Sequence, residues 1–267
     1  MSNLFQDRMG APVTAKRAIL SALSATGTTL STSQLIQCGA LFEVDAAAVR
    51  VALGRLVKNG DVAAVGRGVY GLGDKGKPIF NAIRRWIDLP NHTRPWDHRW
   101  VLVHTAHLGR TKRTALRRRE RAMSFCGLVL LSGGLWLRPD NLRLDGAALR
   151  KRLMGLGLEE EALVITDAAL APDPVQRAVQ LWDRQVLEAS YRDALQTMEQ
   201  CLERRDQVST TQLAAQTAHI GSAVIGMLSF DPLLPAQLVD VGLRDAVHQQ
   251  MLEFDRVGKE ALVAVWK

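Results

Sequence analysis

Apolar residues recur at helical spacing in three stretches near the start of the chain. This spacing predicts helices over Thr14–Ala25 and Ser31–Leu41, and a third helix that begins at Asp45 and ends at Gly60. The Asp45 carboxylate can accept hydrogen bonds from the free N–H groups of the first turn, and Gly60 suits a left-handed C-cap. The pattern therefore predicts a three-helix unit at the start of the chain.

The pattern changes from helix to strand directly after Gly60. Val62 and Val65 lead into a tight turn at Arg67, and Val69 leads out of it, which predicts a two-stranded hairpin. Three helices followed by a small hairpin with an arginine at its tip are typical of a winged helix-turn-helix domain. The alternative is a small helical domain whose basic face contacts only solvent.

The third predicted helix has two different sides. Val49, Leu53 and Leu56 form its apolar stripe, so residues off this stripe should face solvent. In a winged helix-turn-helix, this helix enters the major groove and the hairpin tip contacts the neighbouring backbone. The predicted DNA-contacting residues are Arg50, Val51, Gly54, Arg55, Lys58 and Arg67.

The middle of the chain alternates strands and helices in the order βαββαβ, which is typical of a ferredoxin-like fold. The predicted elements are the strand Trp100–Thr105, the helix Thr111–Ser124, the hairpin strands Leu128–Leu131 and Leu135–Arg138, the helix Asp145–Met154 and the strand Leu163–Thr166. A stretch interrupted by prolines, Asp88–Asp97, is predicted to be a linker that precedes them.

The last part of the chain is predicted to be helical, over about Val175–Arg205, Thr210–Met227 and Ala236–Lys267. The fold class is therefore predicted to be multidomain α+β. We expect a winged helix-turn-helix domain with a linker helix at residues 1–88, a ferredoxin-like middle domain at 98–170, and a helical dimerisation and effector domain at 173–267.

Charge is unevenly distributed along the chain. Met1–Ser124 holds 20 basic and 8 acidic residues, whereas Phe125–Lys267 holds 14 basic and 19 acidic residues. A basic segment of this kind most often contacts nucleic-acid phosphates. The strongest basic run is Arg110–Arg121, RTKRTALRRRER. It fits a second phosphate-contacting surface, a site for a phosphorylated effector, or a solvated helix face.

The sequence gives little support for enzymatic or metal chemistry. The chain contains no P-loop, dinucleotide-binding fingerprint or nucleophile elbow. His104 and His107 have no carboxylate or cysteine close to them in the sequence, and Cys38, Cys126 and Cys201 are far apart, as expected of reduced core residues. Neither a signal peptide nor an apolar run of membrane-spanning length is present. We therefore expect a cytoplasmic protein that is not an enzyme and has no metal, cofactor or membrane partner.

Six segments carry a resemblance to a known family. They are VRVALGRLVKNGDV, GRGVYGL, RWVLV, GLWLRPDNL, LW with SYRDAL downstream of it, and DPLLP, and the resemblance as a whole extends from about Thr14 to about Leu262. Together they resemble the PaaX family of bacterial repressors, whose best-known members control phenylacetate catabolism. The resemblance implies a winged helix, a middle domain with the Cas2 fold, and a helical C-terminal domain. It also implies a homodimer that binds a palindromic operator in double-stranded DNA and is released by an aryl-acetyl-CoA thioester.

The sequence departs from the family pattern in two domains. His219–Ser229 stands where members carry an arginine-rich helix, and Val241–Leu243 stands where members carry Trp-Pro-Gly. Phenylacetyl-CoA is therefore not implied as the effector. His104 and Thr105 stand where Cas2 nucleases carry an acidic residue at the end of the first strand, so nuclease activity is not implied either.

The leading hypothesis is a dimeric transcriptional repressor in which a small-molecule effector shifts the population between two spacings of the DNA-binding heads. The candidate effector-binding residues are Arg117, Arg118, Trp136, Arg138, Trp182 and Tyr191. The aromatic residues among them also fit a role as core anchors. One alternative is a metal-dependent enzyme that processes nucleic acid, with Asp140 and Asp145 as carboxylates near strand ends. Another is an architectural protein without an effector.

Overall fold

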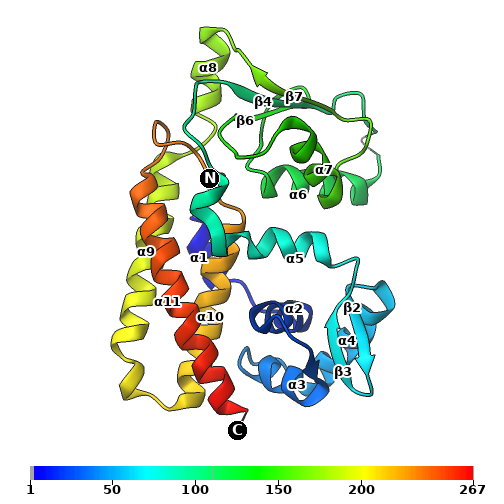
Figure 1. The fold of residues 1–267 in the computed structure, drawn as a ribbon, viewed down its shortest axis with the longest axis vertical. Helices are drawn as coiled ribbons and strands as arrows, with labels where there is room; N and C mark the ends of the chain where they lie inside the picture. The colour runs from blue at the N-terminus through cyan, green and yellow to red at the C-terminus, as the bar shows by residue number, and fades with distance from the viewer. Residues whose placement is uncertain (1–2, 110, 267) are drawn as a thin grey trace. The chain divides into compact units, whose positions relative to one another are not determined.

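The computed structural model of the chain describes residues 3–109 and 111–266 and has a mixed α+β fold with two antiparallel sheets (Figure 1). The chain divides into two compact units. One, here called the middle unit, consists chiefly of Arg85–Ala189 and Leu228–Asp245. The other, here called the helical unit, consists of Leu4–Arg84, Ser190–Met227 and Ala246–Lys267.

The helical unit begins with three helices and a three-stranded sheet that together are called the head. The bounds are α2 Ala15–Thr26, β1 Leu30–Ser31, α3 Thr32–Ala40, α4 Ala46–Asn59, β2 Val62–Gly66 and β3 Val69–Leu72, with α1 Leu4–Met9 before them and α5 Lys77–Arg84 after them. The sheet has the order β1-β3-β2, with antiparallel neighbours. The three predicted helices and the hairpin are thus confirmed, whereas the sequence pattern does not predict α1 or β1.

Local capping explains where the helices of the head start and stop. Asp45 accepts a hydrogen bond from the Ala48 N–H at 2.8 Å, and Ser31 caps α3 through a capping box with Gln34. Gly60 has a φ of 77° and closes α4 in the left-handed conformation. The caps predicted at Asp45 and Gly60 are therefore confirmed.

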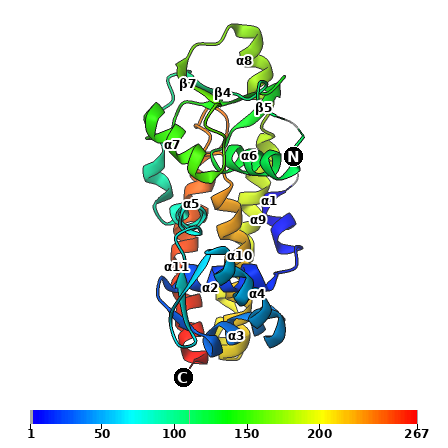
Figure 2. The ribbon, with the colours of Figure 1, turned by 90° about the vertical axis from the view of Figure 1, so that its right-hand side faces the viewer.

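Three long helices complete the helical unit. They are α9 Arg184–Glu203, α10 Thr210–Ser229 and α11 Val241–Val265, with the short 3-10 helix η2 Arg205–Gln207 between the first two. Both views of the ribbon show them running side by side (Figures 1 and 2). Gly221 of α10 faces Met251 and Phe254 of α11, where an added Cβ would stand 3.4 Å from the Met251 methyl carbon. The absence of a side chain at Gly221 thus permits close helix packing.

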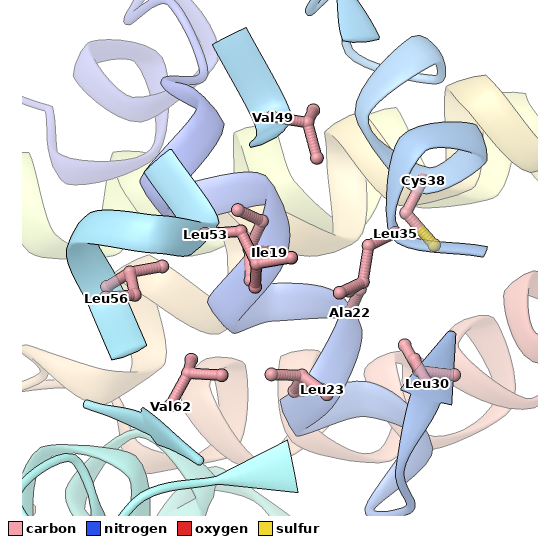
Figure 3. Close-up of a cluster of buried hydrophobic side chains, with 10 residues drawn as sticks. All are labelled: Ile19, Ala22, Leu23, Leu30, Leu35, Cys38, Val49, Leu53, Leu56 and Val62. Carbon is pink, nitrogen blue, oxygen red and sulfur yellow. The ribbon is translucent and has the colours of Figure 1, made fainter. Parts of the chain in front are cut away.

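The core of the head is a cluster of ten buried apolar residues (Figure 3). Leu23 of α2, Leu35 of α3 and Val49 of α4 are fully buried in it. Leu262 and Trp266, at and after the end of α11, also pack against this cluster. The head is therefore held both by its own apolar stripes and by the last helix of the chain.

The middle unit holds a four-stranded sheet with two helices on one face (Figures 1 and 2). The bounds are β4 Trp100–His104, α6 Arg113–Phe125, β5 Val129–Ser132, β6 Leu135–Pro139, α7 Gly146–Leu156 and β7 Leu163–Ala168, flanked by the 3-10 helix η1 Arg85–His92 and by α8 Pro172–Val179. The strand order is β5-β6-β4-β7, and all neighbours are antiparallel. The predicted βαββαβ order of elements is confirmed.

The GLWLRPDNL segment contains β6, and a hydrogen bond connects it to the DPLLP turn within the middle unit. Arg138 is only 1% exposed, and it donates hydrogen bonds to the backbone oxygens of Cys126 and Pro139 and to Oδ1 of Asn141. Asn141 Nδ2 in turn donates to the Leu233 carbonyl oxygen at 2.8 Å. These bonds connect two segments that are far apart in the sequence, and both segments belong to the family resemblance.

The structure corrects three predicted boundaries. The stretch Val175–Arg205 is not continuous: it belongs to α8 and α9, because Asp183 accepts a hydrogen bond from the Val186 N–H and starts a new helix. The last helix begins at Val241 and not at Ala236, because Asp240 caps it through the N–H groups of the next turn. The 3-10 helix η1 occupies part of the predicted linker.

Within the described residues, no helix is both long and apolar enough to cross a membrane.

Candidate nucleic-acid interface

The solvent-facing side of α4 carries most of the predicted DNA-contacting residues. Its opposite side, with Val49, Leu53 and Leu56, is buried in the core of the head. Apart from Asn59 at its end, the exposed residues of α4 are Ala47, Arg50, Val51, Gly54, Arg55 and Lys58. Their spacing of three and four residues places them in one stripe along the helix.

Small side chains alternate with cations on this stripe. Val51 is 55% exposed, although apolar side chains of this size are usually buried. No atom lies within 4 Å of the position that a Cβ would occupy at Gly54. Packing inside the protein therefore does not require a glycine there. A bare patch of backbone allows another molecule to approach the helix closely.

The cations of this stripe have no acidic partners in the part of the chain that the structure describes. Arg50, Arg55 and Lys58 form no ion pair with any described carboxylate, whereas Lys16 in the same unit lies 3.6 Å from Asp61. Their positive charges are therefore available to an external anion.

The turn between β2 and β3 carries the remaining predicted contact, Arg67, which is exposed. The next residue, Gly68, has a φ of 69°, which a glycine adopts without strain. The Gly68 carbonyl oxygen accepts hydrogen bonds from the N–H and the hydroxyl group of Thr32, at 2.9 and 3.3 Å. The start of α3 thus fixes the turn that carries Arg67.

The candidate effector-binding residues are more dispersed. Arg117 and Arg118 are exposed on α6, and Trp136 donates a hydrogen bond to Thr105 Oγ1 at 3.2 Å. Trp182 is buried, and its ring stacks on that of Trp100. Tyr191 is also buried but belongs to the helical unit, whereas the other five candidates belong to the middle unit.

Arg138 stands apart among these candidates because its guanidinium already has three partners inside the protein. Burial lowers the pKa of Arg138 to about 10. A buried guanidinium in which every nitrogen donates a hydrogen bond inside the protein is typical of a structural role. The same burial raises the pKa of the Cys126 thiol to about 11. Cys38, Cys126 and Cys201 are buried and form no disulfide with one another, which confirms that they are core residues.

The sequence does not distinguish Arg119 from its neighbours in the basic run. The structure shows that Arg119 is buried and pairs with Glu159, whose Oε2 accepts from Arg119 Nε at 3.0 Å. The one feature of the sequence that could have indicated burial of Arg119 is its helical spacing from Ala122 and Met123, which places it on their side of α6. Arg110, the first residue of the run, lies outside the described residues.

The carboxylates considered for an enzyme have structural partners. Asp140 pairs with Arg94 and accepts a hydrogen bond from the Asp167 N–H, and Asp145 caps α7 at Ala148. The described residues contain no group of three or more His, Cys, Asp or Glu side chains that could hold a metal ion.

Comparison with known proteins shows that part of the chain is similar to one family. A family model described as PaaX-like protein matches residues 18–76. A search of curated proteins finds no match. The structure is similar to that of the uncharacterized protein Rv0674 from Mycobacterium tuberculosis, with a TM-score of 0.57 and 25% sequence identity over 93% of this chain and 99% of that chain. The resemblance to the PaaX family is therefore confirmed over residues 18–76, which include α3, α4, the β2–β3 hairpin and most of α2.

Proposed function

We propose that this chain is a DNA-binding transcription regulator and that its head is a winged helix-turn-helix. The observation that carries the proposal is the exposed stripe of α4, where cations without a described acidic partner alternate with small side chains. This stripe lies within the PaaX-like segment. A structural role alone does not account for an exposed valine and an exposed glycine in line with three cations that have no described acidic partner.

In the proposed complex, α4 enters the major groove. The groove is about 12 Å wide and admits one helix. Arg50, Val51 and Gly54 face the base edges, where an arginine can donate two hydrogen bonds to a guanine. Arg55 and Lys58 contact phosphates beside the groove, and Arg67 contacts the backbone next to it.

The remainder of the proposal concerns assembly and control. The middle unit has the element order βαββαβ, which is typical of a ferredoxin-like fold, and the family resemblance implies the Cas2 fold there. We propose that the chain is a cytoplasmic repressor that binds a palindromic operator as a homodimer. A small-molecule effector, such as an acyl-CoA thioester, would release it. Support for these points comes from the family resemblance. No observation favours the enzyme alternative, since its candidate carboxylates are used in structural contacts.

The test is DNA binding by full-length variants. Duplexes selected from random sequence provide the specific ligand, and an unselected duplex provides the reference. Arg50→Ala should cost about 1–3 kcal/mol of affinity for the selected duplex and little for the unselected one. Arg256→Ala is the matched control, because Arg256 is exposed but paired with Glu253 and Glu260. Absence of any selected sequence, or equal binding by both variants, would refute the proposal.

A further inference from the structure

A second basic surface without a described acidic partner lies on α6 of the middle unit. Arg113, Arg117, Arg118 and Arg121 are all exposed, while Ala122, Met123 and Phe125 turn the other side of the helix into the unit. Arg113, Arg117 and Arg121 are four residues apart, so they form a row with steps of about 6 Å along the helix axis. The stem of Arg118 borders this row beside Gly157, at the end of α7.

The charges of this surface are not neutralised within the described part of the chain. None of these four arginines forms an ion pair with a described carboxylate. The buried Arg119 of the same helix, in contrast, is paired with Glu159. The helix therefore carries one buried arginine that forms an ion pair and, on its exposed side, arginines that form none with the described residues.

The placement of these cations is unfavourable for α6 itself. Like charges four residues apart on a helix repel each other. The first turn contains no acidic residue, Lys112 provides no side-chain cap, and Arg113 places a positive charge where the helix dipole is already positive. Helix stability therefore does not explain the arginines.

The shape of the surface selects among anions. A compact phosphate group is bound by donors that converge on it from several elements. The α6 arginines instead lie in an extended row along one exposed face of a single helix. A row of guanidinium groups matches a chain of phosphates, as in the backbone of a nucleic acid.

We propose that the α6 arginines bind the phosphate backbone of duplex DNA as a second contact, independent of base sequence. The inference rests on the proposed function, because it adds a contact to a DNA complex formed by the head. The head and α6 belong to different units of one chain, so two weak contacts strengthen each other through effective concentration.

The test compares two full-length double variants. Arg117→Gln with Arg121→Gln removes two charges from the row, and Arg184→Gln with Arg256→Gln removes two exposed arginines that are paired with Glu188 and Glu253. Affinity for an unselected duplex is measured over a range of salt concentrations. The α6 variant should bind several-fold more weakly than wild type, with the slope of log K against log salt smaller by about 1–2. The control variant should keep the wild-type slope.

Four results would overturn the inference. An unchanged slope in a folded α6 variant would make the row a solvated face. Loss of coenzyme A binding, with unchanged DNA binding, would make it a phosphate site for an effector. If the wild-type protein binds no duplex, the proposed function fails and this inference fails with it. If Arg50→Ala weakens specific binding but the α6 variant does not differ from wild type, only this inference fails.

Discussion

Single residues in this chain separate into those that hold the fold and those that are free to bind. Arg119 and Arg138 are buried and fully engaged, whereas Arg50, Arg55 and Arg67 are exposed and have no described acidic partner. The sequence predicts that Arg50 and Arg55 are exposed, because the apolar stripe of α4 determines which of its positions face solvent. It cannot predict the first, since Glu159, the partner of Arg119, is 40 residues away, and the Cys126 carbonyl that accepts from Arg138 belongs to another element.

At residue scale, Arg138→Met should destabilise the protein by about 3 kcal/mol. Methionine fills similar space but leaves the Cys126 carbonyl and the Asn141 amide without their buried donor. Denaturant unfolding measures the effect. Arg177→Met is the control, because Arg177 is exposed on α8, and it should change stability by less than about 0.5 kcal/mol. Equal stability of both variants would show that the guanidinium is not a structural link.

Arg67 supports a prediction of a different kind. Because it lies at an exposed turn and not on a helix that enters the groove, Arg67→Ala should weaken binding to selected and unselected duplexes alike. The slope of log K against log salt should become smaller by about 0.9, the contribution of one phosphate contact. Binding measured at several salt concentrations checks this, and an unchanged slope would exclude the hairpin from the interface.

At the scale of elements, local signals explain what the sequence predicts. Caps at Ser31, Asp45 and Gly60 define α3 and α4 with little error. Short elements are harder to predict. The strand β1 has only two residues, Leu30 and Ser31, and it is defined by their pairing with Tyr70 and Val69 of β3. The break between α8 and α9 contains neither glycine nor proline, so its only local signal is the cap at Asp183.

The contact of α11 with the head also has no sequence signal. Leu262 packs against the core of the head, while its neighbour Val263 is 47% exposed. Leu262→Ala should therefore lower the unfolding free energy by about 1–2 kcal/mol, and Val263→Ala should change it little. Thermal or denaturant unfolding of both variants measures the difference. A similar effect at the two positions would mean that α11 does not support the head.

At the scale of the whole molecule, the proposal depends on two linked heads. The three predicted domain boundaries and the homodimer remain predictions, because they concern how parts and copies of the chain are arranged. We expect sedimentation velocity to show a dimer. The dimer should bind a duplex with two half-sites about 100-fold or more tightly than a duplex with one, because the second head binds at high effective concentration. A monomer with no preference for paired half-sites would contradict the repressor mechanism.

The central claim is that α4 selects the DNA sequence, and the most direct measurement is the set of sequences that the protein enriches from random duplexes. Wild-type protein should enrich a two-fold symmetric motif. Arg50→Ala should enrich the same motif but lose the base preference at one position in each half-site, because one pair of base contacts is gone. An identical motif from both proteins, or no enriched motif from the wild type, would contradict the claim.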